Sequence, residues 1–162
     1  MNTLIVYAST HGCTEKCAHK LANQLPNSPT VANLKKNTRI ELNDFETVVI
    51  GGSIHAGRMQ AAVRKFCQKN LSQLKPKRIG LFVCCMEENE KAQQQFDEAF
   101  PTELLDQAIA KGFFGGEFDF DKMNFVIKAI IKKIAHVDHS VSKIAEDEIS
   151  KFAAKIANPT AS

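Results

Sequence analysis

Short apolar runs along the chain alternate with longer segments in which apolar residues recur every three or four positions. The first run, residues 2–8 (NTLIVYA), is nearly continuous and contains β-branched side chains, which is typical of a strand buried on both faces. Similar runs occur at 47–53 (TVVIGGS) and 78–86 (RIGLFVCCM), with a weaker one at 30–34 (TVANL). The pattern predicts five strands, the last in the glycine-punctuated segment 112–120 (GFFGGEFDF).

The segments between these strands have helical periodicity. Apolar residues at helical spacing follow the first strand, and Pro26 ends that pattern. An amphipathic helix is expected over 57–74 and another over 88–111, where Pro101 must break or restart the helix. A final helix is predicted through Ile144, Ile149, Phe152 and Ile156.

Strands separated by helices of this length imply β-α-β units with right-handed crossovers. The predicted class is therefore α/β, with a parallel sheet covered by helices in three layers. A chain of 162 residues is long enough to bury one core without disulfides. We expect a single domain over residues 1–157 and a flexible tail over 158–162, with no internal repeat or linker.

Composition excludes several classes of protein. Hydrophobic residues make up 44% of the chain and charged residues 24%, and no apolar run reaches the roughly 20 residues that a membrane-spanning helix needs. The first residues pass directly into the first strand without a basic leader, so we expect a cytoplasmic protein. A formal charge of +3 is too small for a dedicated nucleic-acid binder but is compatible with an anionic ligand.

Three loops follow predicted strands at the edge where open parallel sheets bind ligands. The first is STHGCT at 9–14, between a buried strand and a helix. Its hydroxyl groups, together with the N–H groups and dipole of the helix N-terminus, would surround a phosphate. The loop matches neither the nucleoside triphosphate motif nor the dinucleotide fingerprint, so a monophosphate fits better.

The other two loops suit a flat ring. GGSIHAG at 51–57 places small residues after one strand, and CCMEENE at 84–90 follows the next strong strand. One loop for a phosphate and two for a ring predict a site for flavin mononucleotide (FMN). The predicted cofactor-binding residues are Ser9, Thr10, His11, Gly12, Cys13, Thr14, Gly52, Ser53, Ile54, His55, Ala56, Gly57, Cys85 and Met86.

These segments resemble a known family. STHGCTE at 9–15 resembles the phosphate loop of flavodoxins, and VVIGGSIHAG at 48–57 is similar to the ring loop of a flavodoxin-like subgroup that includes the menaquinone-dependent protoporphyrinogen dehydrogenases. Residues 113–135 are similar to that subgroup's last strand and basic, apolar helix. The resemblance implies a flavodoxin-like fold, with a five-stranded parallel sheet in the order 2-1-3-4-5, and non-covalently bound FMN.

The first loop also has other interpretations. Its hydroxyl groups can simply cap a helix that begins at Cys13 or Thr14. Cys13 and Cys17 share a helix face, with His11 and His19 nearby, but the spacing matches no zinc signature and Cys17 continues the core-facing pattern. We therefore expect no metal site, reduced cysteines, and a phosphate contact through the Cys13 N–H rather than a reactive thiol.

The basic residues near the predicted ring site can each be interpreted in two ways. His55 can stack on the ring or face solvent, and Arg58 can meet an acidic partner or merely begin a helix. A late stripe of Lys128, Lys132 and Lys133 can touch an anionic membrane surface or be the solvated face of a packed helix.

Three functions remain open from the sequence. The first is an FMN flavoprotein that transfers electrons and needs no catalytic side chain, because the cofactor supplies the redox chemistry. The second is a protoporphyrinogen-dehydrogenase-like oxidoreductase that passes electrons to a quinone. The third is an interaction module that kept the fold without flavin. Expected partners are a redox protein, a quinone or another small electron donor or acceptor, with no nucleic acid and at most peripheral membrane contact.

Overall fold

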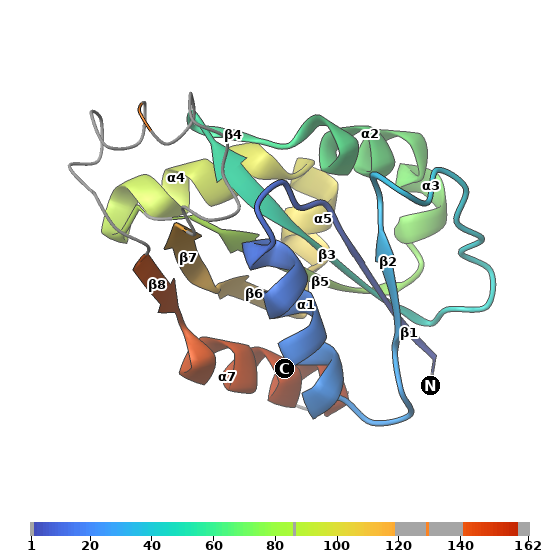
Figure 1. Ribbon diagram of the computed structural model, residues 1–162. Helices are drawn as coiled ribbons and strands as arrows, with labels where there is room; N and C mark the ends of the chain where they lie inside the picture. Colours follow the sequence, from blue (N-terminus) through green and yellow to red (C-terminus); the bar gives the residue numbers. More distant parts are fainter. Residues whose placement is uncertain (1, 86, 119–128, 130–140, 159–162) are drawn as a thin grey trace.

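A computed structural model of the protein describes residues 2–85, 87–118, 129 and 141–158. One sheet lies between two layers of helices (Figure 1). Its five parallel strands follow the order β2-β1-β3-β5-β6, which is the predicted order 2-1-3-4-5 when these strands alone are counted. They are β1 (Thr3–Tyr7), β2 (Thr30–Asn33), β3 (Thr47–His55), β5 (Arg78–Cys84) and β6 (Ala110–Phe113).

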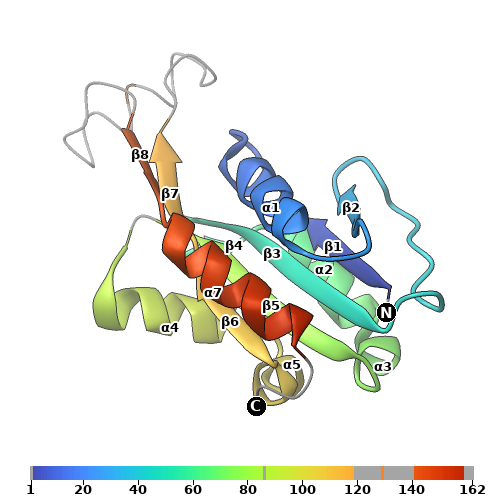
Figure 2. The same cartoon turned by 90° about the horizontal axis from the view of Figure 1, so that it is seen from below.

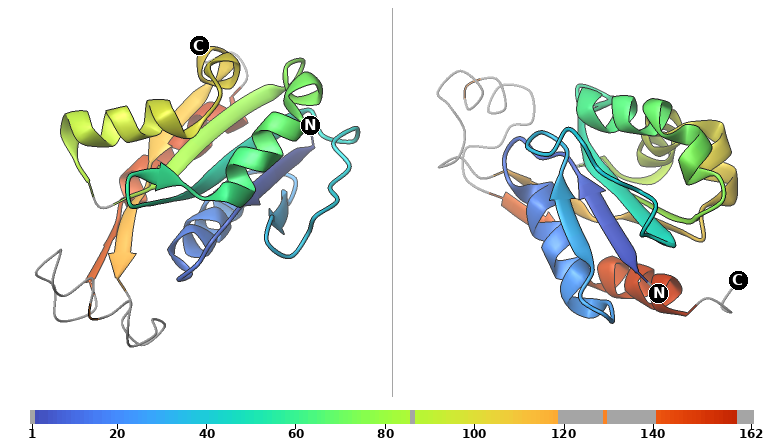
Figure 3. Two further views of the ribbon diagram at one scale, coloured as in Figure 1. Left: turned by 90° about the horizontal axis from the view of Figure 1, so that it is seen from above. Right: turned by 90° about the vertical axis from the view of Figure 1, so that its right-hand side faces the viewer.

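Helices cover both faces of this sheet, as predicted. One face carries α1 (Cys13–Gln24) and α7 (Glu146–Ala157), which lie in front of the strands in Figure 2. Figure 3 shows the helices of the opposite face. They are α2 (Ala61–Lys69), α3 (Leu71–Leu74), α4 (Asn89–Ala99) and α5 (Thr102–Gln107).

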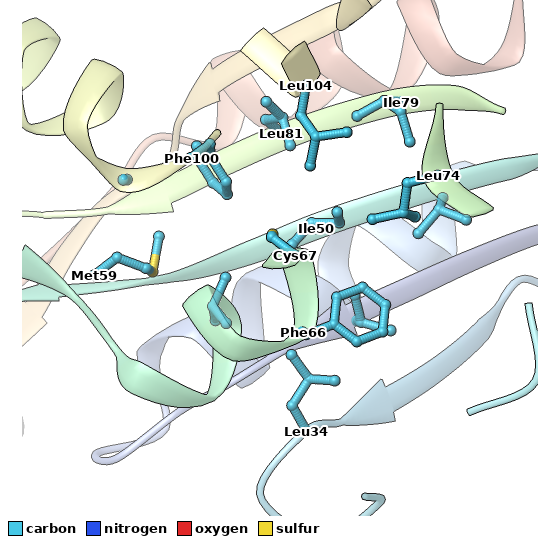
Figure 4. Close-up of a cluster of buried hydrophobic side chains, with 14 of the residues drawn as sticks. Leu34, Ile50, Met59, Phe66, Cys67, Leu74, Ile79, Leu81, Phe100 and Leu104 are labelled. Atoms are coloured by element: carbon cyan, nitrogen blue, oxygen red, sulfur yellow. The ribbon is translucent and has the colours of Figure 1, made fainter. Parts of the chain in front are cut away.

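Alternation along the strands divides the core in two. On β5, Leu81 and Val83 belong to the cluster under α2 to α5, in which Figure 4 shows Leu81, whereas Phe82 and Cys84 face α1 and α7. Because β1, β5 and most of β3 are buried on both faces, their sequences are continuous apolar runs rather than alternating ones. The edge strand β2 is partly exposed and has the weaker run. The continuous apolar runs that predicted a parallel sheet therefore arise because a core lies on each face of the sheet.

The face under α7 is built from aromatic rings packed over glycine. The Phe82 and Phe114 rings stack with centroids 4.5 Å apart, and Phe152 of α7 meets Phe114 edge-on at 5.2 Å. A Cβ built at Gly51 would lie 2.0 Å from the Phe82 ring. Gly51 therefore provides the space in which the Phe82 ring lies across the neighbouring strand.

The predicted helix over 57–74 is wrong at its start. Strand β3 continues to His55, and β4 (Arg58–Met59) pairs antiparallel with it across a two-residue turn. Ala56 and Gly57 form that turn with φ of 51° and 77°, the left-handed values that suit tight hairpins. The helical part begins at Ala61 and is divided at Asn70 into α2 and α3.

The end of the chain also differs from the sequence-based expectation. The helical region 88–111 is interrupted at Pro101 as predicted, but Ala110 already belongs to β6. The predicted strand 112–120 is split, because β7 (Gly115–Phe118) leaves the main sheet and pairs with β8 (Val141–Ile144). Ile144, expected in a helix, therefore lies in a strand. The predicted lysine stripe lies outside the described residues.

Within the described part of the chain, none of the helices combines the length and the apolar character that crossing a bilayer requires.

Candidate functional site

The first predicted loop lies between β1 and the N-terminus of α1. Gly12 takes the N-cap position with φ of 92°, and its N–H donates to Ser9 Oγ at 2.9 Å. The helix begins at Cys13, as one interpretation predicted, but Gly12 has no side chain with which to cap it. The N–H groups of the first turn have no intrahelical acceptor, so this end of α1 is suited to an anion.

Thr10 connects the loop to two segments that are distant in sequence. Its Oγ1 accepts a hydrogen bond from Lys35 Nζ at 2.9 Å and another from Gln60 Nε2 at 2.8 Å. Gln60 Oε1 in turn accepts from the Ser53 N–H at 3.3 Å. Sequence reasoning missed Lys35 and Gln60, since both contacts are long-range and neither residue belongs to a recognisable motif.

The first and second loops also meet at a pair of hydroxyl groups. Thr14, in the first turn of α1, is fully buried, and its Oγ1 shares a hydrogen bond with Ser53 Oγ near the end of β3. Strand order reverses between β1 and β3, because the chain passes from β1 to β2 on one side and to β3 on the other. Such a switch point is where open α/β sheets bind ligands.

Two histidines lie beside these loops. The rings of His11 and His55 meet edge-on with centroids 6.0 Å apart. Partial desolvation lowers the pKa of each below its ordinary value, and the positive charge of Lys35 lowers both further, with His11 adding to the effect at His55. A bound anion would relieve this repulsion, so the arrangement favours negative charge.

The second loop is a hairpin rather than an open loop. Ser53 and Ile54 are half-buried in β3, whereas His55, Ala56 and Gly57 are exposed around the turn. Gly52 is buried, and a Cβ there would lie 2.5 Å from Met59 Sδ. Gly52 therefore makes room for a side chain of its own hairpin, which adds a structural reason for a glycine that the sequence suggested only for ring contact.

The third loop starts beside the second, because Ser53 of β3 is the register partner of Cys84 of β5. Cys85 follows, half-buried, and Met86 lies outside the described residues. A hollow of about 650 Å³ adjoins this loop between α4 and the paired strands β7 and β8, with Cys85, Phe113 and Lys143 among its lining residues. It includes no residue of the first two loops.

The predicted residues that the structure describes, all except Met86, thus lie at the carboxyl ends of β1, β3 and β5. Cys13 contributes to the loop through its backbone only, because its side chain is buried beside Cys17 and Cys84. His19, one of the neighbours considered for a metal site, is exposed on α1.

The chain is similar to known flavodoxin-domain proteins. A family model described as a flavodoxin domain matches residues 4–143. Protoporphyrinogen IX dehydrogenase (quinone) of Escherichia coli strain K12 is 31% identical over 77 residues, a match that covers 46% of this chain and 42% of that protein. The match therefore spans less than half of the curated relative.

Solved structures of flavodoxins share the fold. Oxidised flavodoxin 1 from Bacillus cereus has a TM-score of 0.60 at 14% identity, and the alignment covers 96% of both chains. Fusobacterium nucleatum flavodoxin bound to flavin mononucleotide has a TM-score of 0.52 at 13% identity, over 96% of this chain and 97% of that one. At such identities the likeness shows the fold alone.

Proposed function

Because this chain belongs to the flavodoxin domain family, we propose that it binds one FMN non-covalently and transfers electrons through the flavin. The observation that carries the proposal is the N-terminus of α1, which has no side-chain cap and follows a loop in which the Thr10 hydroxyl accepts a hydrogen bond from Lys35. A phosphate monoester carries about two negative charges at neutral pH. The positive end of the helix and the lysine both favour such a group at this position.

The ring would lie between the second and third loops. His55 stands at the tip of the β3–β4 hairpin, and Cys85 follows the neighbouring strand β5. When bound, FMN supplies the redox chemistry, and these residues orient the ring and set its surroundings. The hydrogen bonds from Gln60 to Thr10 and from Ser53 to Gln60 hold the two loops in a fixed relation. No side chain needs to act as an acid or a base in this account.

A second candidate is transfer of electrons to a quinone, as the name of the Escherichia coli relative describes. The hollow of about 650 Å³ favours it, since this space adjoins Cys85 and is large enough for a small aromatic molecule. Its charged lining residues are Glu87, Glu88, Lys143 and Glu148. The porphyrinogen substrate belongs to the same candidate and depends on the same match.

Spectroscopy followed by turnover tests both candidates. The purified chain should take up one FMN with visible flavin bands, and acid denaturation should release the flavin unchanged. The reduced, FMN-loaded chain is then mixed with a redox protein such as cytochrome c or with the soluble quinone menadione. Rapid oxidation by menadione alone supports the second candidate, and oxidation by the redox protein supports the first. A chain that takes up no FMN contradicts both and leaves a flavin-free interaction module.

A further inference from the structure

Three cysteine side chains from two elements meet under the first loop. Cys13 and Cys17 lie one turn apart on the inward face of α1, and Cys84 is the last residue of β5 on the face that α1 covers. Their sulfur atoms all lie within 4.8 Å of one another. The residues are 7%, 0% and 3% exposed, and all three thiols are reduced. We call these three residues the sulfur cluster.

The spacing of the sulfur cluster suits a metal ion. A cation that binds three thiolates in a plane at about 2.3 Å holds the sulfur atoms about 4 Å apart, so a small contraction of the cluster is sufficient. Thiolates are soft ligands that select Cu(I) or Zn²⁺. Zn²⁺ in a closed site takes four protein ligands, whereas the cluster, within the described residues, contains three cysteines without a histidine or carboxylate. We propose that the sulfur cluster binds one Cu(I) ion in three-coordinate geometry.

The proton balance of this reaction follows from the state of the thiols. A cysteine thiol ordinarily has a pKa of about 8.5, and hydrogen bonding to Cys13, together with burial, raises the pKa of Cys17 and Cys84 further, so the cluster without metal is protonated at neutral pH. Binding breaks three S–H bonds, forms three Cu–S bonds and releases three protons to solvent. No oxidant or reductant is required, because copper enters and remains as Cu(I).

The position of Cys13 provides both access and charge stabilisation. It is the first residue of α1, and the residues before it, from Ser9 to Gly12, are at least partly exposed. An ion therefore reaches the sulfur atoms by displacing this short loop. Three thiolates around one monovalent cation carry net negative charge, which the positive end of α1 stabilises.

The chain contains a matched control for simple burial. Cys67 is also fully buried, but it lies in the opposite core between the sheet and α2, and burial raises its pKa to about 12. It is not part of the sulfur cluster. If copper binds only to buried thiols in general, Cys67 should matter as much as Cys17. If the cluster is the site, Cys67 should not matter.

Competitive titration tests the proposal. The full chain is titrated anaerobically with Cu(I) against a chromophoric Cu(I) chelator, and C17S and C84S are compared with C67S. The cluster predicts one tightly bound Cu(I) per chain, a loss of about 100-fold or more in affinity for C17S and C84S, and an unchanged affinity for C67S. Equal affinity in C17S and wild type, or a loss in C67S as large as that in C17S, overturns the proposal.

X-ray absorption of the copper-loaded wild type keeps the test independent of whether the variants fold. Three sulfur neighbours at a single distance support the cluster, and two sulfur neighbours contradict it. A parallel titration with Zn²⁺ tests the choice of ion. Binding of Zn²⁺ as tight as that of Cu(I) would show that a fourth ligand is available and would overturn the three-coordinate site.

Discussion

Replacing Lys35 with methionine should weaken FMN binding without changing the binding of riboflavin, which lacks the phosphate. Lys35 Nζ donates to Thr10 Oγ1 at 2.9 Å, so its charge lies at the edge of the predicted phosphate loop. Two unit charges 4 Å apart interact by about 1 kcal/mol in water, and Lys35 is exposed. The variant should therefore bind a phosphate dianion about 1–2 kcal/mol less tightly, which corresponds to an FMN dissociation constant raised by roughly 5- to 30-fold.

Flavin fluorescence titration measures both ligands with one assay. Methionine keeps the apolar stem of the lysine, and Thr10 retains its hydrogen bond from Gln60 at 2.8 Å, so the loop should keep its shape. Lys36→Met is the matched control, because that neighbouring side chain is also exposed. Equal losses for FMN and riboflavin, or equal effects of the two lysine variants, would refute a phosphate contact at this position.

Three further predictions concern pH, packing and metal. The pKa values of His11 and His55 are lowered in the folded state, so the unfolded chain binds protons more readily near the ordinary histidine pKa. The free energy of unfolding without flavin should therefore fall as the pH decreases through about 6.5. Urea unfolding should show a smaller fall in an H11Q/H55Q variant. In the same assay, Gly51→Ala should lower the free energy of unfolding by about 1–3 kcal/mol or more, because the added Cβ would overlap the Phe82 ring. Gly57→Ala should lower it by about 1 kcal/mol, because the site has open space but a positive φ. Cu(I) in the sulfur cluster should raise the FMN dissociation constant, and FMN should weaken Cu(I) binding by the same factor, which paired titrations can compare.

Much of the fold could be predicted because its signals are local. The apolar runs of β1, β3 and β5 mark strands buried on both faces, and Pro101 falls where α4 and α5 separate. The β3–β4 hairpin was missed because its turn uses Ala56 before Gly57. Alanine seldom adopts φ of 51°, so nothing in the sequence marks a two-residue turn there.

The split of the last predicted strand has a different cause. Gly115 has φ of 78°, and a Cβ there would lie 1.9 Å from the Lys143 carbonyl oxygen, so this glycine redirects the chain into the second sheet. The pairing partner β8 lies about 25 residues further along the sequence. A glycine-punctuated strand and two strands joined at a glycine look alike until that partner is known.

The candidate site shows the same division between local and long-range information. The residues from Ser9 to Thr14 could be identified from their position between a strand and a helix. The contacts of Lys35 and Gln60 with Thr10 depend on how distant segments meet, and sequence spacing alone does not contain them. The sulfur cluster is similar, because Cys84 joins Cys13 only through packing of α1 on β5.

The most direct test of the central claim is to locate FMN on the chain by amide chemical-shift mapping during a titration. The account predicts the largest shifts at the N–H groups of residues 10–14, with a second set at 53–57, and saturation at one FMN per chain. Riboflavin should affect the second set and leave the first nearly unchanged. Largest shifts elsewhere, for example around 87–93, or no saturable shifts at all, would contradict a flavin phosphate at the N-terminus of α1.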